Sequence, residues 1–426
     1  MRGSAREKAL SKSIRKLALV TGLVCLSACS VTEKPVTGMI TTPPSISQTT
    51  VPMIVEGDQL LVELDAIRPD GSTRKLLANV NMGHSHPALQ AHVYKELGID
   101  QGRAFSFRLG GIPISVDAHA VDQLDDAAAP DRQVGPFFFP QNVEAWLQAG
   151  VLEQFDLVLD YANKTMTLAQ PGSLPLEGTA VPIRLNQDTG LVTVDFVVEG
   201  RPYPIVIDSG GGYSWIRRST AGQWRNAHPE WQRAEGAVGL SNYNMLPYAF
   251  EREGTVLRLS EAAIGAMPVQ NVGVLGAGPA LGWPWDTLFG EVVFDLWQKG
   301  APEPVIGWLG GNVLKHYRLT IDYRNRMSYW LRTSDIDPRE LDQVGVTLVY
   351  KHGDYRIGSI VRKAGKPTVE GIEIGDRILA VDGRPSQGWS REEMLAALQG
   401  QPGDPRVLTV ERDGQSLTVP TVVTGF

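Results

Sequence analysis

The sequence predicts a mainly β protein in which two related β-barrel lobes are followed by a C-terminal domain. Three observations support this. Short apolar segments alternate with Gly, Pro, Asn and Asp turns, a long internal repeat is present, and the pattern changes near residue 340. Segments such as QLLVELDAI and LVTVDFVV have the length and composition of strands. Helical patterns are few and short, and they fall at residues 87–97, 143–152, 311–316 and 391–398.

The N-terminal segment has the pattern of an export signal rather than of a folded element. Six basic residues lie within residues 1–16, and an apolar stretch at 17–26 is too short to span a bilayer core of about 30 Å. The stretch ends in LSAC and resembles a bacterial lipobox, which is cut before Cys29. The other interpretation is an ordinary secretory signal with an incidental cysteine.

The lipobox resemblance implies that residues 1–28 are removed, that Cys29 carries lipid, and that residues 29–50 form a tether. Ser30 is not the Asp associated with retention at the inner membrane. We therefore expect the protein at the periplasmic face of the cell envelope, anchored by lipid to the outer membrane.

Charge and cysteine usage exclude several other roles. Residues 1–28 carry six basic residues and Glu7, so the formal charge of −7 for the whole chain becomes −12 from Cys29 onward. This balance argues against nucleic-acid binding and against electrostatic attachment to membranes. The two cysteines are Cys25 and Cys29, so we expect no disulfide within the processed chain and no cysteine-based metal cluster.

The internal repeat relates two helix–strand–turn–strand segments. GVLEQFDLVLDYANKTMTL begins at Gly150, NVLKHYRLTIDYRNRMSYW begins at Asn312, and the offset of 162 residues stays constant across the match. Earlier in each copy, residues 76–85 align with residues 204–212, which pairs Asn81 with Asp208. We interpret the two copies as related lobes of unequal length.

The segment IVIDSGGGYSW raises the question of whether Asp208 or Ser209 carries the chemistry. In a trypsin-like enzyme the serine would be the nucleophile, preceded by a glycine before the aspartate and by a histidine in a tight upstream loop. Here Ile207 precedes Asp208, and His119 lies in no such loop. The sequence therefore favours Asp208.

The stretch YPIVIDSG resembles the catalytic loop of retropepsin-like aspartic proteases, and VIGWLGGNVLKHYRLTIDY resembles the second motif of that family. The resemblance covers residues 192–330. It implies that Asp208 is the catalytic acid or base, and that four residues form the supporting loops: Ser209, Gly210, Leu309 and Gly310. This chemistry needs two carboxylates that share one proton.

The first lobe departs from the family pattern at the position of the second carboxylate. It offers Asn81-Met82-Gly83, so the shared proton and the bracing hydroxyl are both missing. Three alternatives remain open: Asp208 pairs with Asp208 of another chain, another acid serves, or the protein binds peptides without cleaving them. His84 and His86 face the same way on an extended segment and could replace the carboxylate or bind metal; the plainer interpretation is a polar loop.

The C-terminal segment contains GDRILAVDG at residues 375–383, which resembles the most recognisable stretch of a PDZ domain. A helix at 391–398 and a hairpin at 408–419 complete the pattern. PDZ domains bind extended peptides by strand addition. The resemblance predicts that the groove lies beside the strand at 355–361, lined by Gly353, Tyr355, Arg356 and Ile357.

The resulting prediction is a mainly β chain with two retropepsin-like (acid-protease) lobes at 51–172 and 173–335 and a PDZ domain at 340–426. The function predicted is an aspartic endopeptidase acting on envelope or periplasmic proteins, whose PDZ domain selects or positions peptides. The alternative is a non-catalytic peptide-binding lipoprotein. The partners we expect are protein substrates and C-terminal or extended peptides; we expect no cofactor, metal or nucleic acid.

Overall fold

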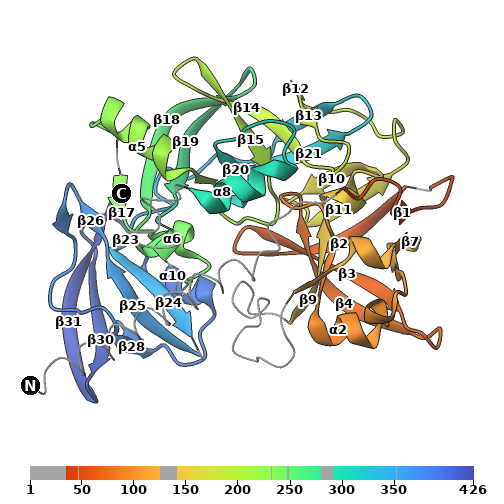
Figure 1. Cartoon of the computed structure of the whole chain (residues 1–426). Helices are drawn as coiled ribbons and strands as arrows, with labels where there is room; N and C mark the ends of the chain where they lie inside the picture. Colours follow the sequence, from red (N-terminus) through yellow and green to blue (C-terminus); the bar gives the residue numbers. More distant parts are fainter. Residues whose placement is uncertain are drawn as a thin grey trace, which may run out of the picture.

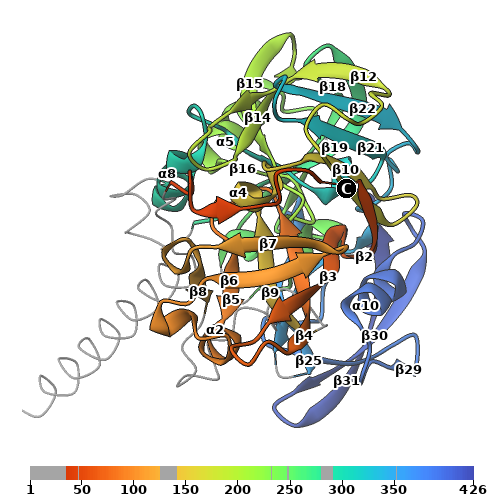
Figure 2. The same cartoon turned by 90° about the vertical axis from the view of Figure 1, so that its right-hand side faces the viewer.

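The structure, a computed structural model, describes residues 35–46, 48–124, 142–231, 233–246, 249–279, 291–351 and 353–426. Cys25, Cys29 and the predicted signal lie outside these ranges. Three parts follow one another along the chain: a first repeat, a second repeat and a C-terminal unit (Figure 1). Figure 2 shows the same parts turned by 90°, with the C-terminal unit at the lower right. Within the described ranges, no helix is long and apolar enough to cross a membrane.

The first repeat spans residues 40–169 and is built mainly from strands. Its strands are β1 (Ile40–Thr41), β2 (Thr49–Glu56), β3 (Gln59–Ile67), β4 (Thr73–Asn81), β5 (Ala88–Gln90), β6 (Phe105–Leu109), β7 (Ile112–Val116), β8 (Asp122–Leu124), β9 (Val143–Gln148), β10 (Asp156–Asp160) and β11 (Thr165–Ala169). Its helices are short: α2 (Ala91–Glu96), η1 (Ile99–Gln101), η2 (Ala118–Ala120) and α4 (Ala149–Leu152).

The second repeat spans residues 179–332 and is longer. Its strands are β12 (Thr179–Pro182), β13 (Arg184–Leu185), β14 (Val192–Val198), β15 (Arg201–Ile207), β16 (Trp215–Ile216), β17 (Arg233–Glu235), β18 (Thr255–Ile264), β19 (Met267–Gly276), β20 (Gly307–Leu309), β21 (Tyr317–Asp322) and β22 (Met327–Arg332). Its helices are α5 (Arg218–Ala227), η4 (Gly239–Asn242), α6 (Ala249–Arg252), α8 (Val292–Trp297), η5 (Gln298–Gly300) and α9 (Gly311–Leu314).

The C-terminal unit, residues 343–426, packs one helix against a small sheet. It contains β23 (Gln343–Val344), β24 (Val346–Lys351), β25 (Asp354–Ile360), β26 (Arg362–Lys363), β27 (Lys366–Pro367), β28 (Arg377–Val381), β29 (Arg384–Pro385), α10 (Arg391–Leu398), β30 (Pro405–Arg412) and β31 (Gln415–Thr424). The main strand order is β23-β31-β30-β28-β25-β24, which leaves β24 at the edge. Ser390 caps α10 through a reciprocal pair of hydrogen bonds with Glu393, as its sequence predicts.

The two repeats share one strand arrangement around their central loops. In the first, β4 pairs in parallel with β9, and β9 pairs antiparallel with β5. In the second, β15 pairs in parallel with β20, and β20 pairs antiparallel with β16. A four-residue helix, α4 or α9, follows the middle strand in each case. The strands β4 and β15 therefore end at equivalent places. The first ends at Asn81, and the second ends at Ile207, the residue before Asp208.

The prediction of a helix over residues 143–152 was wrong for most of that range. Residues 143–148 form β9, and only residues 149–152 are helical. All six residues of β9 are buried, because the strand lies between β4 and β5. Its sequence, VEAWLQ, lacks the strict apolar–polar alternation of a half-buried strand, so periodicity alone did not identify it as a strand.

A six-stranded antiparallel sheet joins the repeats, in the order β12-β22-β21-β10-β11-β2. At its centre Leu157 of β10 pairs with Ile321 of β21. The hairpin turns on either side match: Asp160 accepts hydrogen bonds from the backbone and side-chain nitrogens of Asn163, and Asp322 accepts the same pair from Asn325. These turns lie 162 residues apart, which is the offset seen in the sequence.

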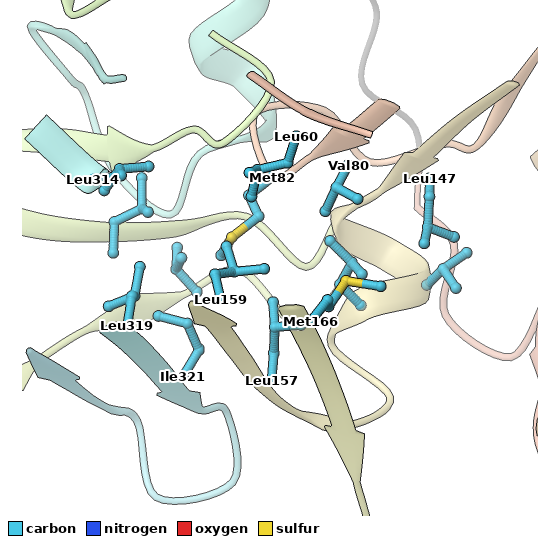
Figure 3. Packing of buried hydrophobic residues seen from close by; sticks show 14 of the residues in the cluster. Leu60, Val80, Met82, Leu147, Leu157, Leu159, Met166, Leu314, Leu319 and Ile321 are labelled. Carbon is cyan, nitrogen blue, oxygen red and sulfur yellow. The ribbon is translucent and has the colours of Figure 1, made fainter. Parts of the chain in front are cut away.

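One apolar cluster runs through both repeats above this sheet. Figure 3 shows Leu157 and Leu159 of β10 beside Leu319 and Ile321 of β21, with Met82 extending toward Leu159. Met82 is fully buried. Burying one such side chain stabilises the fold by roughly 1.5–3 kcal/mol. Because both repeats contribute side chains to this cluster, they depend on a common core.

The matched turns give a prediction for stability. Asp322→Ala removes both hydrogen bonds to Asn325 from a carboxylate that is almost fully buried. We expect a loss of about 1–2 kcal/mol in the free energy of unfolding, measured by urea denaturation. The control is Asp335→Ala, whose partner Arg332 is exposed. Equal stability of the two variants would contradict the role given to the turn.

Candidate functional site

Asp208 lies at the end of β15, where the parallel pairing with β20 delivers it to the inner face of the second repeat. Its backbone N–H donates to the carbonyl of Leu309 at 3.0 Å. Its carboxylate Oδ1 accepts the backbone N–H of Gly210 at 2.8 Å. Only 7% of the residue is exposed. The position of this carboxylate is therefore fixed by backbone contacts on both sides.

Burial raises the pKa of the Asp208 carboxyl above its ordinary value. The charge of His84 and the backbone N–H groups of Gly210, Gly211 and Gly83 act in the opposite direction without cancelling the effect of burial. The side chain thus combines a proton affinity higher than usual with ready-made stabilisation of its ionised form. A carboxyl of this kind is suited to taking up and releasing a proton.

Asn81 mirrors Asp208 in the first repeat. Its side-chain Oδ1 accepts the backbone N–H of Gly83 at 2.8 Å, which is the same turn that Asp208 makes with Gly210. This bond turns Nδ2 of Asn81 toward the second loop, where a Cβ placed on Gly210 would lie 2.3 Å from it. A Cβ on Gly83 would lie 2.6 Å from Cγ of Asp208. The two loops therefore pack directly against each other, and only glycine fits at these two positions.

Ser209 ties the two loops together. Its hydroxyl donates to the backbone carbonyl of Val80 at 2.8 Å, and both residues are completely buried. The matching position in the first loop is Met82, which has no hydroxyl and packs into the core instead. Ser209 therefore holds the two loops together from the side of the second repeat.

His84 and His86 do not face the same way. Their segment turns instead of running extended. His84 is half-buried and acts on Asp208 electrostatically, whereas Nδ1 of buried His86 lies 3.6 Å from Asp122 Oδ1. Across the described ranges, no three His, Cys, Asp or Glu side chains are close enough together to hold a metal ion. The histidine pair is therefore split between two environments.

The turn that follows β20 packs against the loop of Asp208 and is hydrogen-bonded to it. Gly310 donates its N–H to the hydroxyl of Ser214 at 3.0 Å, and a Cβ on Gly310 would lie 2.5 Å from the carbonyl oxygen of Tyr213. Leu309 is completely buried in the core. Asn312, which sequence reasoning did not single out, accepts from both the N–H and the hydroxyl of Ser214 at 2.8 Å.

Two further contacts at the site were missed by sequence reasoning. Gln59 donates through Nε2 to the carbonyl of Gly210 at 2.9 Å, and Trp297 donates through Nε1 to the carbonyl of Gly83 at 2.7 Å. Each joins residues more than 150 positions apart, so no local pattern could have indicated them. A glutamine at the start of a strand ordinarily indicates an exposed position. A tryptophan on a short helix ordinarily indicates packing in the core.

The comparisons with known proteins identify one domain. Residues 369–412 match the family model of the PDZ domain, which confirms that prediction for the C-terminal unit. No curated protein matches the chain. Among solved structures, the chain is similar to basic 7S globulin from soybean, with 9% sequence identity, a TM-score of 0.37, and coverage of 68% of this chain and 96% of that one. A likeness this remote carries no inference.

The peptide groove of the PDZ domain was predicted beside the wrong strand. Tyr355, Arg356 and Ile357 lie on β25, which pairs with β24 on one side and β28 on the other. Gly353 lies in the turn between β24 and β25. A strand paired on both sides has no free backbone groups for an added peptide. The strand with an edge is β24, so the groove lies between β24 and α10.

The close contact of the two loops gives a second prediction. Gly83→Ala would force a methyl group against the Asp208 carboxylate, so we expect a loss of about 3 kcal/mol in the free energy of unfolding. The control is Gly222→Ala inside α5, where an added Cβ meets nothing within 4 Å. We expect it to stabilise by about 0.5–1 kcal/mol in the same urea titration. A Gly83→Ala protein as stable as wild type would rule out this loop packing.

Proposed function

We propose that the chain is a lipid-anchored, aspartic-type endopeptidase of the cell envelope, with Asp208 as its catalytic group. The observation that carries the proposal is the buried Asp208 carboxylate, held by backbone N–H groups where two matching loops meet. Two retropepsin-like lobes are part of the proposal. The repeated strand order and the six-stranded sheet between the repeats support it. The PDZ domain would position peptide substrates.

Because Asn81 replaces the second acid of the family pattern, the proposed mechanism departs from it and uses one carboxylate for both proton transfers. Ionised Asp208 takes a proton from a water molecule, whose oxygen adds to the carbonyl carbon of the scissile peptide bond. Asp208 then gives that proton to the departing nitrogen, which leaves a carboxylic acid and an amine. Nδ2 of Asn81 faces this loop and can donate to the developing oxyanion.

Pairing of Asp208 with Asp208 of another chain fits less well. The Asn81 loop of the same chain already packs on this carboxylate, with Gly83 against Cγ of Asp208. A second chain would have to displace that loop and break the bond from Ser209 to Val80. We therefore favour a site made within one chain.

A second candidate function is peptide binding without cleavage. Asn81 favours it, because an amide cannot donate and recover a proton as a second carboxyl would. The PDZ domain supports peptide binding in either case.

Catalysis is tested by cleavage of an unfolded protein substrate across a range of pH. We expect Asp208→Asn to lower the rate by about 100-fold or more, and Ser209→Ala to lower it less, because its hydroxyl braces the loop. Wild-type activity should fall as the pH falls through the raised pKa of Asp208, since the ionised form is the base. Asn81→Asp should raise activity with an acidic optimum, because two carboxyls can then share a proton.

Full activity of Asp208→Asn would end the aspartic-protease proposal. Serine-directed inhibitors should have no effect on wild type. If all four proteins bind peptide and none cleaves it, the second candidate function replaces the first.

The envelope location rests on the sequence of residues 1–29 alone. We expect the wild-type chain to incorporate a labelled fatty acid and to sediment with outer membranes, and Cys29→Ala to do neither. Cys25→Ala is the matched control, because this residue would leave with the signal. A Cys29→Ala protein that is processed and sediments with membranes as wild type does would refute lipid attachment at this position.

A further inference from the structure

The groove of the PDZ domain is already in contact with the second repeat. PDZ domains bind extended peptides beside an edge strand and below a helix. Here β24 is that edge strand, since it pairs only with β25, and α10 is the helix. Residues 237–246, which include η4 and the chain after it, lie along the open side of β24. Figure 1 shows β24, α10 and the neighbouring α6 gathered in this region.

The edge of β24 finds its hydrogen-bond partners in this segment. The N–H of Leu348 donates to Oδ1 of Asn242 at 2.6 Å, and the carbonyl of Leu348 accepts Nδ2 of the same side chain at 3.1 Å. The N–H of Tyr350 donates to the carbonyl of Met245 at 2.9 Å. These are the backbone groups that strand addition would use, and the chain itself occupies them.

Two side chains of the segment are buried inside the PDZ core. Tyr243 and Met245 are 3% and 1% exposed, and they belong to the same apolar cluster as Met394, Leu395 and Leu398 of α10. Both lie in the turn that continues η4, where Tyr243 has helical dihedral angles. The segment therefore fills the groove from within the chain, with hydrogen-bond partners along β24 and two buried side chains packed with α10.

The segment also carries one feature that favours its release. Met245 has a φ of +49°, a left-handed conformation that costs a side chain of this type roughly 1 kcal/mol or more. This strain weakens the contact relative to an unstrained one, whereas the hydrogen bond from the Tyr243 hydroxyl to buried Glu56 stabilises it.

We propose that residues 242–246 are the resident ligand of the PDZ groove, and that an outside peptide binds by displacing Tyr243 and Met245. The outside ligand is an extended peptide that pairs with β24 and carries aromatic and flexible apolar side chains in place of Tyr243 and Met245. The proposal rests on the peptide-binding part of the proposed function and is independent of cleavage by Asp208.

The test uses the labelled hexapeptide Ser-Asn-Tyr-Asn-Met-Leu, the sequence of residues 241–246, and the full processed chain. Binding is followed by fluorescence anisotropy. Met245→Ala weakens the resident segment, so we expect it to bind the peptide at least 10-fold more tightly than wild type does. Met53→Ala, an equal truncation in the core of the first repeat, should bind as wild type does.

Leu395→Glu added to Met245→Ala should abolish binding, because it places a charge in the groove. Asn242→Ala, which breaks both bonds to Leu348, is a second release variant and serves if Met245→Ala does not unfold cooperatively. Equal affinity of wild type and the release variants, absence of binding in all of them, or binding that survives Leu395→Glu would each overturn the proposal. The anisotropy readout follows binding at the PDZ groove and needs no cleavage, so a failure of catalysis leaves this result unaffected.

Discussion

The contact between the Asn81 loop and the Asp208 loop constrains the rest of the molecule. Gly83 and Gly210 leave no room for a side chain on either surface, so β4 and β15 must end at the same place. That condition fixes how the repeats face each other and which residues enter the shared core. The bond from Ser209 to Val80 then holds the loops together at a depth where water cannot compete.

The Asn81 loop and the Asp208 loop are more alike in backbone conformation than in the side chains they carry. Both loops make the same turn, yet one presents a carboxylate and the other an amide. The charge of a single buried carboxylate must be stabilised by its surroundings, and glycine N–H groups and His84 do so. In a matched pair of acids the partner would share that task. The Asp208 carboxylate therefore depends on fixed dipoles and one histidine rather than on a second acid.

Sequence reasoning succeeded where a residue's role is decided by its neighbours in the chain. The strand before Asp208 and the paired Asp-Tyr turns are both local patterns. It failed where partners are distant. Residues 143–148 lack the alternation of a half-buried strand because both faces of β9 are buried, and nothing in the sequence of β25 indicates that β24 lies between it and the edge. Gln59 and Trp297 reach the loops from far along the chain, and such contacts leave no periodic signal.

The pairing of β10 with β21 can form only late in the synthesis of the chain. Leu157 must wait for Ile321 to be synthesised, so the edge of β10 stays unpaired while about 160 further residues are made. At roughly 5–20 residues per second this exposure lasts on the order of 10–30 seconds. An unpaired apolar strand is a template for aggregation during that interval. Until the last strands arrive, the first repeat therefore presents this edge of β10 to other copies of the chain.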